Sequence, residues 1–458
     1  MKLKHIGRIA LLMALLMMGA CSAPGRVPVP GEPRWHAGFG SAEIALPCTD
    51  GPFYIAGYHN GVEIGGVRDL QQVCALWLDA GGPGTLLLSV DCIGLGSNSV
   101  ERIRARLAPL LKSERCLVHV VSTHDHAGAD TLGLWGPVGV DGKDPEFMEN
   151  LFAACEEAAK RALADRRSGR LFRADVETQG MLRDSRDPQI MDETLHMLRF
   201  EADEGAGIRL MSYGAHAESL RGANIRLSRD YPGVLCELVT EQTGDRTMFL
   251  PGAVGGLVMT KEFVETADME ENLLRTGSLL AGYALSGADW RELAPELSDC
   301  SVSFAVPLEN TVFLYYKFLG ILGNKAVRGG GSTGYSLETS LSLLRLGDTA
   351  LLLIPGEIFP ELVFGGGREK PAHPEIADPE PLADILARHG TDDFFIVGLA
   401  DDELGYIVPP RDFLTDERAP YLKAAAPSDG SRHYEETNSV GPECAERIAE
   451  ALRVLLGE

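Results

Sequence analysis

The sequence predicts an α/β (α+β) protein in which mixed β-sheets are layered with helices, within one large domain. Short apolar runs of strand length alternate with longer amphipathic stretches, but not in strict β–α–β order. No linker divides residues 34–458, and 45% of the 458 residues are apolar against 24% charged, which is enough to bury a large core. The net charge of −24 disfavours nucleic-acid binding, because phosphate backbones repel an acidic protein.

Apolar runs bounded by glycine, proline or charged residues predict the strands, and apolar residues repeating every three or four positions predict the helices. The turn Gly-Gly-Pro-Gly at 81–84 separates two strand-like runs, and Val100, Ile103 and Leu107 share one face of a helix. The expected strands are 73–78, 85–90, 116–122, 195–200, 208–213, 302–306, 340–346, 350–354 and 394–397. The expected helices are 100–111, 147–164, 234–243, one or two within 263–285, and 445–456, and glycine-rich loops are expected at 329–335 and 365–367.

The N-terminus is typical of a bacterial lipoprotein. Residues 1–20 carry three basic side chains and then an apolar run, 9–18, that is shorter than the roughly 20 residues a bilayer span needs. Gly-Ala-Cys follows, so we expect a signal peptide over 1–20, lipidation at Cys21 and a proline-rich tether over 21–33. The expected location is the bacterial cell envelope, at the outer membrane or cell surface, with membrane contact through the lipid anchor only. The alternative is an ordinary secretory signal.

Eight further cysteines are present, an even number that export would allow to pair. Those in apolar runs, such as Cys74 and Cys236, are more typical of free buried cysteines. The sequence leaves any pairing open. It contains no C-x-x-C motif, which disfavours a zinc ribbon or a thioredoxin-type centre.

Polar side chains follow four of the expected strands, at the point where each strand ends. Imidazole is a common zinc ligand, and groups that follow neighbouring strands can converge on one cleft. Each residue alone also has a plain structural reading, as a turn histidine, a helix-capping glutamate or a packed tyrosine. Neither the H-x-H-x-D-H pattern of metallo-β-lactamases nor the zincin H-E-x-x-H is present. The candidates are His124 and His126, His216, Glu357 and Tyr406.

Several segments, in one order along the chain, resemble the catalytic domain of the neutral/alkaline (non-lysosomal) ceramidase family. Their combination is more specific than any one of them. The matching segments are Ala37-Gly38-Phe39-Gly40, Gly57-Tyr58, Leu88-Ser89-Val90-Asp91, Thr123-His124-Asp125-His126-Ala127-Gly128, Gly214-Ala215-His216, Leu227 to Gly233, Pro355-Gly356-Glu357 and Gly405-Tyr406-Ile407.

The resemblance implies a zinc-dependent hydrolase that cleaves the amide (N-acyl) bond of a small-molecule or lipid-like substrate. It implies one Zn²⁺ per chain, held by His124, His216, Glu357 and Tyr406. His126 is then expected to be a catalytic histidine near the metal, although the sequence leaves open which of His124 and His126 is the ligand.

Four further residues are expected to support this site. Asp91 and Asp230 could orient the ligating histidines by accepting hydrogen bonds from their second ring nitrogens. Arg183 and Arg186 lie in a polar stretch and could contact an anionic group of the substrate.

Two departures from the family pattern put ceramide itself in doubt. Ala253 and Gly255 stand where the family carries the acid and the serine of G-D-V-S-P. No C-terminal immunoglobulin-like domain is expected after the closing helix. Two alternatives therefore stay open: a non-catalytic, ceramidase-like surface binding module, and a zinc esterase or deacylase acting on envelope or scavenged glycans.

Overall fold

The central strands of this protein are buried on both faces, namely β3 (Gln72–Asp79), β4 (Gly84–Val90), β9 (Ile208–Tyr213) and β17 (Thr349–Leu353). The computed structural model describes residues 33–48, 51–261 and 268–458. In β3, Val73 and Trp77 pack among helices, whereas Leu76 and Leu78 on the opposite face pack against a second sheet. Side chains alternate between the two faces of a strand, so an unbroken apolar run such as this one requires cover on both sides.

The first sheet is mixed and contains nine strands in the described part of the chain. Its order is β11-β9-β8-β6-β1-β3-β4-β5, with β13 paired to β6. The pairs β4–β5 and β9–β11 are parallel, and the other pairs are antiparallel. The remaining bounds are β1 (Trp35–Glu43), β5 (Cys116–Ser122), β6 (Arg167–Glu177), β8 (Thr194–Ala202), β11 (Arg246–Pro251) and β13 (Arg291–Leu293).

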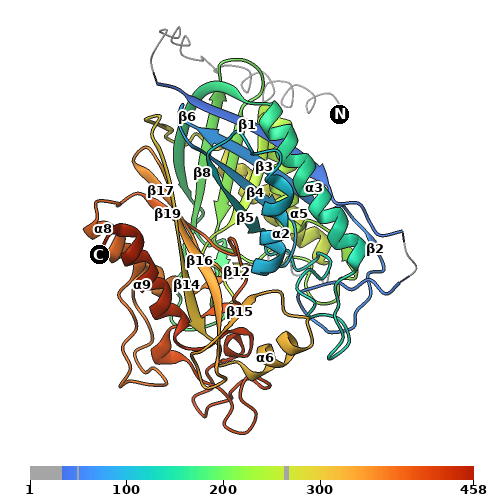
Figure 1. Cartoon of the computed structure of the whole chain (residues 1–458), viewed down its shortest axis with the longest axis vertical. Coiled ribbons are helices and arrows are strands. Elements are labelled where there is room, and N and C mark those ends of the chain that lie inside the picture. Colours follow the sequence, from blue (N-terminus) through green and yellow to red (C-terminus); the bar gives the residue numbers. More distant parts are fainter. Residues whose placement is uncertain (1–32, 49–50, 262–267) are drawn as a thin grey trace, which may run out of the picture. The chain divides into compact units, whose positions relative to one another are not determined.

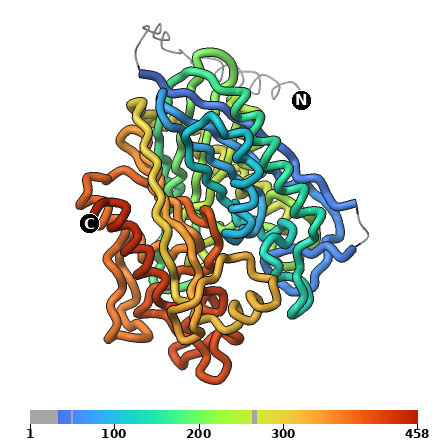
Figure 2. Tube along the Cα trace, in the orientation of Figure 1, coloured from blue at the N-terminus to red at the C-terminus, as the bar shows by residue number. Residues whose placement is uncertain are grey.

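The second sheet comes from the C-terminal part of the chain, drawn from yellow to red in Figure 2. Its order is β14-β16-β17-β19, with β15 paired to β16, and only the β17–β19 pair is parallel. Its strands are β14 (Leu297–Pro307), β15 (Lys325–Arg328), β16 (Tyr335–Leu346), β17 (Thr349–Leu353) and β19 (Phe394–Val397). Leu344, Leu351 and Phe395 pack against the first sheet, so the two sheets share one core.

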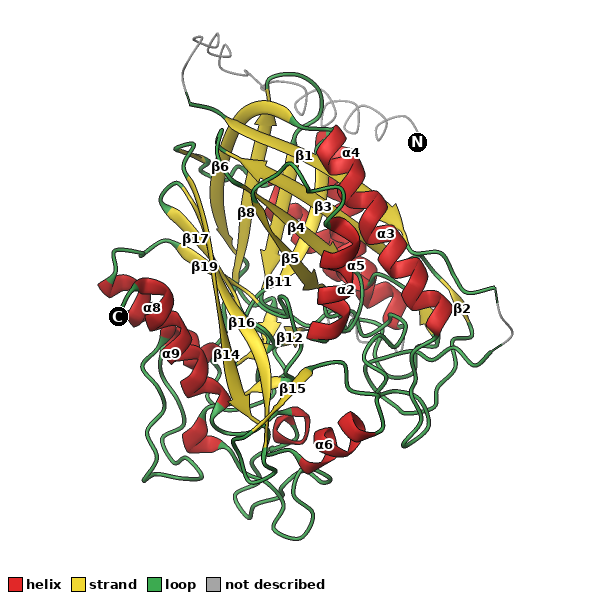
Figure 3. Ribbon diagram, viewed as in Figure 1, coloured by secondary structure: helices red, strands yellow, loops and turns green. Residues whose placement is uncertain are grey.

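Helices cover the outer face of each sheet and complete a four-layer arrangement (Figures 1 and 3). Helices α2 and α3 pack against β1, β3 and β4, and α4 and α5 cover the half of the first sheet that contains β11. Helix α9 packs against β14 and β16. The bounds are α2 (Ser97–Leu107), α3 (Pro145–Ala164), α4 (Asp230–Thr243), α5 (Met269–Leu285), α6 (Thr311–Phe318), α7 (Pro360–Phe364), α8 (Leu382–Arg388) and α9 (Cys444–Leu456), with short 3₁₀ turns η1 (Pro410–Asp412) and η2 (Glu435–Asn438).

The fold class predicted from the sequence is confirmed, and each of the nine expected strands is present. The helix expected over 100–111 ends at Leu107, because Pro109 has no N–H to continue the hydrogen-bond ladder. The helix expected within 263–285 begins at Met269, and 262–267 lie outside the described residues. Within the described residues, no helix is long and apolar enough to cross a membrane.

Strand β1 was not expected, because glycine weakens a strand. The structure gives its glycines a packing role. A Cβ on Gly40 would lie 2.1 Å from the carbonyl oxygen of Ala158, and one on Gly38 would lie 2.1 Å from that of Ala162. Helix α3 therefore rests directly on the backbone of β1, at a distance that only glycine permits.

Residues 34–458 form one compact unit. The expected signal peptide, Cys21 and all of the tether except Pro33 lie outside the described residues. The eight cysteines from Cys48 to Cys444 form no disulfide within the described part of the chain.

Candidate metal centre

Three short strand pairs lie outside the two main sheets, and one of them carries two of the candidate side chains. These pairs are β2 (Gly66–Val67) with β10 (Arg226–Leu227), β7 (Leu182–Arg183) with β12 (Met259–Thr260), and β18 (Glu357–Ile358) with β20 (Tyr406–Ile407). In the parallel pair β18–β20, Glu357 lies directly opposite Tyr406. These two strands follow β17 and β19 of the second sheet, so the carboxylate and the phenol leave that sheet side by side.

The three histidines come from the first sheet. His124 and His126 lie in the loop after β5, and His216 lies shortly after β9. The backbone N–H of His126 donates to the carbonyl oxygen of Ala217 over 2.9 Å, which joins the two loops. Backbone hydrogen bonds thus bring the histidines of two separate strands to one place.

All five candidate side chains meet at one buried point. The carboxylate oxygen Oε2 of Glu357 lies 3.0 Å from Nε2 of His216 and 3.2 Å from Nε2 of His124. The Tyr406 hydroxyl lies 3.3 Å from Nε2 of His216, and Nε2 of His126 lies 3.2 Å from Nε2 of His124. The donor nitrogens of the three histidines all lie within 4.8 Å of one another.

Hydrogen bonds to the backbone orient two of the imidazoles. Nδ1 of His124 donates to the carbonyl oxygen of Ile93, and Nδ1 of His216 donates to that of Val258, each over 2.8 Å. With Nδ1 carrying the hydrogen, Nε2 is the nitrogen that presents its lone pair to the centre. His124 also has a positive φ of 61°, an uncommon conformation that the surrounding hydrogen bonds maintain.

The donor set fits a zinc ion. Atoms bound tetrahedrally to zinc at about 2.0–2.2 Å are about 3.3–3.6 Å apart. The separations of 3.2 Å for His124–Glu357, 3.0 Å for His216–Glu357 and 3.3 Å for His216–Tyr406 are close to this range. Imidazole nitrogens and a carboxylate oxygen are ligands that zinc accepts. The side chains are nearly inaccessible to solvent, which suits a site that holds a charged group in a fixed geometry.

The electrostatics of the cluster reflect burial and close contact. Burial lowers the pKa of His126 well below its usual range, and the neighbouring His124 and His216 add to the effect. Burial would also lower the pKa of His216, but its hydrogen bond to Glu357 and the charge of that residue outweigh this and raise it. Burial would raise the pKa of Glu357, but the charges and hydrogen bonds of His124 and His216 hold it well below its usual range.

A cavity of about 70 Å³ opens beside these residues. Its walls are largely apolar, and the chain supplies polar groups from several loops. The lining residues are Gly57, Ile93, His124, His126, Leu132, Leu134, Trp135, Phe313, Leu322, Glu357, Glu403, Gly405, Tyr406, Tyr434 and Asn438. A larger hollow of about 720 Å³, lined by parts of β1, β3, α3 and α4, contains none of the candidate ligands.

The structure adds residues at the site that sequence reasoning did not single out. Tyr58 packs edge-on against the His126 ring at 5.4 Å and donates its hydroxyl hydrogen to Glu218 over 2.6 Å. Glu403, Tyr434 and Asn438 face the cavity from the loops around β20 and η2. In the sequence, the one signal for these residues was the segment Gly57-Tyr58, which is part of the resemblance to the ceramidase family.

Comparisons with known proteins identify the fold. No known family matches the sequence, and no curated protein does either. The neutral ceramidase from Pseudomonas aeruginosa matches the structure with a TM-score of 0.69 at 14% identity, covering 93% of this chain and 74% of that chain. A ceramidase complexed with C2 matches with a TM-score of 0.68 at 14% identity, covering 93% and 75%. The chain has the fold of neutral ceramidases.

Two expected supporting residues have other partners. Asp91 is hydrogen-bonded to Nε of Arg229 over 2.7 Å, and Asp230 accepts the backbone N–H groups of Ser219 and Leu220 over 2.9 and 3.1 Å. The second ring nitrogens of His124 and His216 donate to backbone carbonyls, as described above. The prediction that Asp91 and Asp230 orient these histidines directly is therefore wrong, because the backbone already fills that role.

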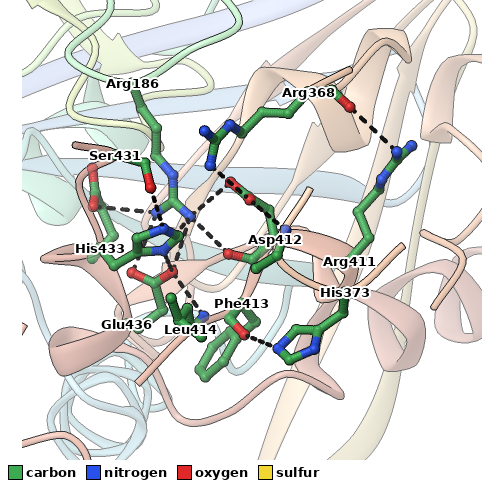
Figure 4. A network of polar contacts seen from close by, with 12 residues as sticks. Arg186, Arg368, His373, Arg411, Asp412, Phe413, Leu414, Ser431, His433 and Glu436 are labelled. Carbon is green, nitrogen blue, oxygen red and sulfur yellow. Dashed lines mark hydrogen bonds and ion pairs between the residues drawn. The ribbon is translucent and has the colours of Figure 1, made fainter. Parts of the chain in front are cut away.

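Arg186 is also placed differently from the expectation. Arg186 is 5% exposed. Its guanidinium donates to Asp412 over 3.0 Å and to Glu436 over 2.9 Å (Figure 4). It also donates to Glu435 over 3.3 Å. It also lies 5.1 Å from the centre of the Phe359 ring. These carboxylates engage the side chain, so the predicted contact with an anionic substrate group is not what the structure shows.

Arg183 lies in β7, which pairs with β12. Its Nη2 donates to the sulfur of Met259 over 2.9 Å, and the two residues are paired in the β7–β12 ladder. Met259 is in turn bridged to His216. Arg183 thus supports the loop that carries His216, and its contact with a substrate stays a prediction.

The structure leaves no room for a side chain at Gly255. A Cβ at this position would lie 2.4 Å from the backbone nitrogen of Phe359 and 2.6 Å from the carbonyl carbon of Ile358. The backbone N–H of Gly255 donates to Ile358 over 2.9 Å. The strand that begins with Glu357 packs against this glycine so closely that a serine requires the backbone to move.

Proposed function

We propose that this chain is a zinc-dependent hydrolase that cleaves an amide (N-acyl) bond, with one Zn²⁺ held by His124, His216, Glu357 and Tyr406. The observation that carries the proposal is the meeting of these four side chains, with spacings that suit a tetrahedral ion, beside a cavity. The ceramidase fold supports the same reaction class. Ceramide is not favoured as the substrate, because the cavity is small and Gly255 stands where the family has serine.

The residues around the centre fit this chemistry. Bound zinc would act as a Lewis acid on the acyl carbonyl. His126 presents Nε2 to the same point without contacting Glu357, so it is the histidine free to accept a proton from water and return it to the leaving amine. Tyr58 packs against its ring and limits its rotation. The apolar wall that includes Leu132 and Trp135 restricts the access of bulk water.

Metal analysis and substrate assays test the proposal together. Purified protein should contain one zinc per chain, and the double variant His124→Ala/His216→Ala should contain none. His389→Ala is a matched control, because His389 lies at the end of α8 and pairs with Glu458. All three proteins are then assayed on N-acyl sphingosines, on short N-acyl amines and on the corresponding short esters.

Each outcome is informative. Zinc-dependent turnover of short amides supports the proposal, and turnover of sphingosine amides would restore ceramide as substrate. Turnover of esters alone would favour the esterase or deacylase alternative. Zinc-free wild-type protein with no turnover would favour a non-catalytic binding module.

We also propose that the chain is anchored to the bacterial cell envelope by a lipid on Cys21 and that it binds no nucleic acid. The signal-like segment 1–20 and the tether 21–33 motivate the anchor. Cells expressing Cys21→Ala should release the protein from the membrane fraction, and radioactive palmitate should label only the wild type. Equal membrane retention of both forms would contradict the anchor.

A further inference from the structure

The cavity beside the metal centre contains an acidic side chain whose hydrogen bonding is incomplete. Oε1 of Glu403 accepts the backbone N–H of Gly405 over 2.8 Å. Glu403 is 8% exposed, and its second oxygen, Oε2, is buried and has no hydrogen-bond partner among the described residues. Glu403 lines the same cavity as Glu357 and Tyr406. A buried carboxylate oxygen without a donor is costly, so a site of this kind calls for a ligand.

The loop around Glu403 is fixed from several directions. Oδ1 of Asp402 accepts the backbone N–H of Ser97 over 2.6 Å and a side-chain N–H of Asn324 over 2.7 Å. Asn324 also donates to the carbonyl oxygen of Glu403 over 2.9 Å. The backbone is therefore held, and the carboxylate stays at the cavity wall.

The protein supplies no cation to complete the Glu403 interaction. Among the described residues that line the cavity there is no lysine and no arginine, and the lining also contains the apolar side chains of Leu132, Leu134 and Trp135. A carboxyl oxygen accepts hydrogen bonds whether or not the group is protonated. A ligand that carries a hydrogen-bond donor would complete this interaction.

The size of the cavity limits that ligand. A buried water needs roughly 10–15 Å³ on this measure, so about 70 Å³ provides room for roughly five to seven small groups. A long alkyl chain exceeds this space, and it would also leave Oε2 of Glu403 against hydrocarbon.

We propose that Glu403 is a specificity-determining residue that binds a hydrogen-bond donor, a hydroxyl or an ammonium, on the amine side of a short N-acyl substrate. This inference rests on the proposed amide hydrolysis, since it assigns the substrate class for that site. Glu403 selects small, polar N-acyl amines and disfavours analogues in which an alkyl group replaces the donor.

Three isosteric probes test this directly in binding experiments. N-(2-hydroxyethyl)acetamide carries a hydroxyl, N-(2-aminoethyl)acetamide carries an ammonium, and N-propylacetamide carries a methyl group at the same place. Isothermal titration of the full, zinc-loaded chain should show that at least one donor-bearing probe binds about tenfold or more tightly than the propyl probe. The first two probes also show which donor is preferred.

Two variants assign the preference to Glu403. Glu403→Gln should reduce the preference for the ammonium probe over the propyl probe. Glu403→Met should reverse that preference, because it improves the binding of the propyl probe. A reversal cannot come from unfolding, so it separates recognition from stability. Glu338→Gln is the matched control, because Glu338 pairs with the exposed Lys325.

Equal or undetectable binding of all three probes would overturn the inference, and so would an unchanged preference in Glu403→Met. Zinc content and amide turnover are measured on the same preparations. If zinc or turnover is absent while the donor preference depends on Glu403, the proposed hydrolysis fails and the recognition of a donor stands. If turnover is present without the preference, only the role of Glu403 fails.

Discussion

His119 allows a quantitative test of how the two sheets are held together. It lies in β5, where Nδ1 is 2.7 Å from Asp401 and Nε2 is 3.1 Å from Asp299 of β14, and it is 1% exposed. Burial alone would lower the pKa of His119, but the charge of Asp401 and the hydrogen bonds to Asp299 and Asp401 raise it from 6.5 to about 10. The imidazolium is therefore the stable form in the folded protein.

The magnitude follows from linkage between protonation and folding. A pKa raised from 6.5 to about 10 corresponds to about 5 kcal/mol of folding free energy. Because the folded pKa is the higher one, this contribution is complete below pH 6.5 and is lost as the pH rises through 10. The loss is about 1.4 kcal/mol per pH unit over most of that window.

Urea unfolding of the wild type and of His119→Gln between pH 6 and pH 10.5 measures this contribution, with the zinc content kept equal. The variant should be less stable by about 3–5 kcal/mol at pH 6, because Asp299 loses its partner. The difference between the two proteins should shrink as the pH rises. A difference that stays constant from pH 6 to pH 10.5 would refute the reasoning, since it would show that His119 acts by packing alone.

Three further predictions concern the surroundings of the site. Arg186→Met should lower the free energy of unfolding in urea by about 3–5 kcal/mol, because it leaves buried carboxylates unpaired. The control Arg447→Met, at an exposed ion pair, should lower it by less than about 1 kcal/mol. Equal losses in the two variants would contradict the role of the buried network. Gly255→Ser should lower the free energy of unfolding by about 1–3 kcal/mol and weaken zinc binding, because the added atoms displace the strand that begins with Glu357. Calorimetric zinc titration measures the second effect, and an unchanged zinc affinity would contradict the close approach of this strand to Gly255. Removing zinc should lower the melting temperature of the wild type in a thermal scan. With the free metal at a hundred times its dissociation constant, the loss should be equivalent to about 3 kcal/mol. The melting temperature of His124→Ala should not change when zinc is removed.

The core strands could be predicted from the sequence because they are apolar on both faces. Strand β6 (Arg167–Glu177) could not, because arginines alternate with its apolar residues and its partners are far away in the sequence. Arg173, for example, stacks on Phe395 and pairs with Asp175, so a charged residue lies buried in a strand. Only the three-dimensional neighbours make such a residue compatible with the core.

The candidate site was predictable where it depends on strand ends. Glu357 and Tyr406 follow the paired strands β17 and β19, but His124 and His216 follow β5 and β9, which are not neighbours in the first sheet. Each of the four residues could be singled out because it follows an apolar run, and the resemblance to the ceramidase family grouped them. The placement of Glu403 depends on how long loops fold onto one another, which local patterns do not encode. The same holds for Arg186, because its carboxylate partners lie more than 220 residues later in the chain.

The origin of the ligands has a consequence for assembly. The imidazoles leave one sheet and the carboxylate and phenol leave the other, so a fragment that ends before β14 would carry every histidine of the centre and still lack half of the coordinating atoms. At the proposed metal site, zinc affinity should therefore report the docking of the two halves. A substitution that loosens their shared interface far from the centre should weaken metal binding before secondary structure is lost.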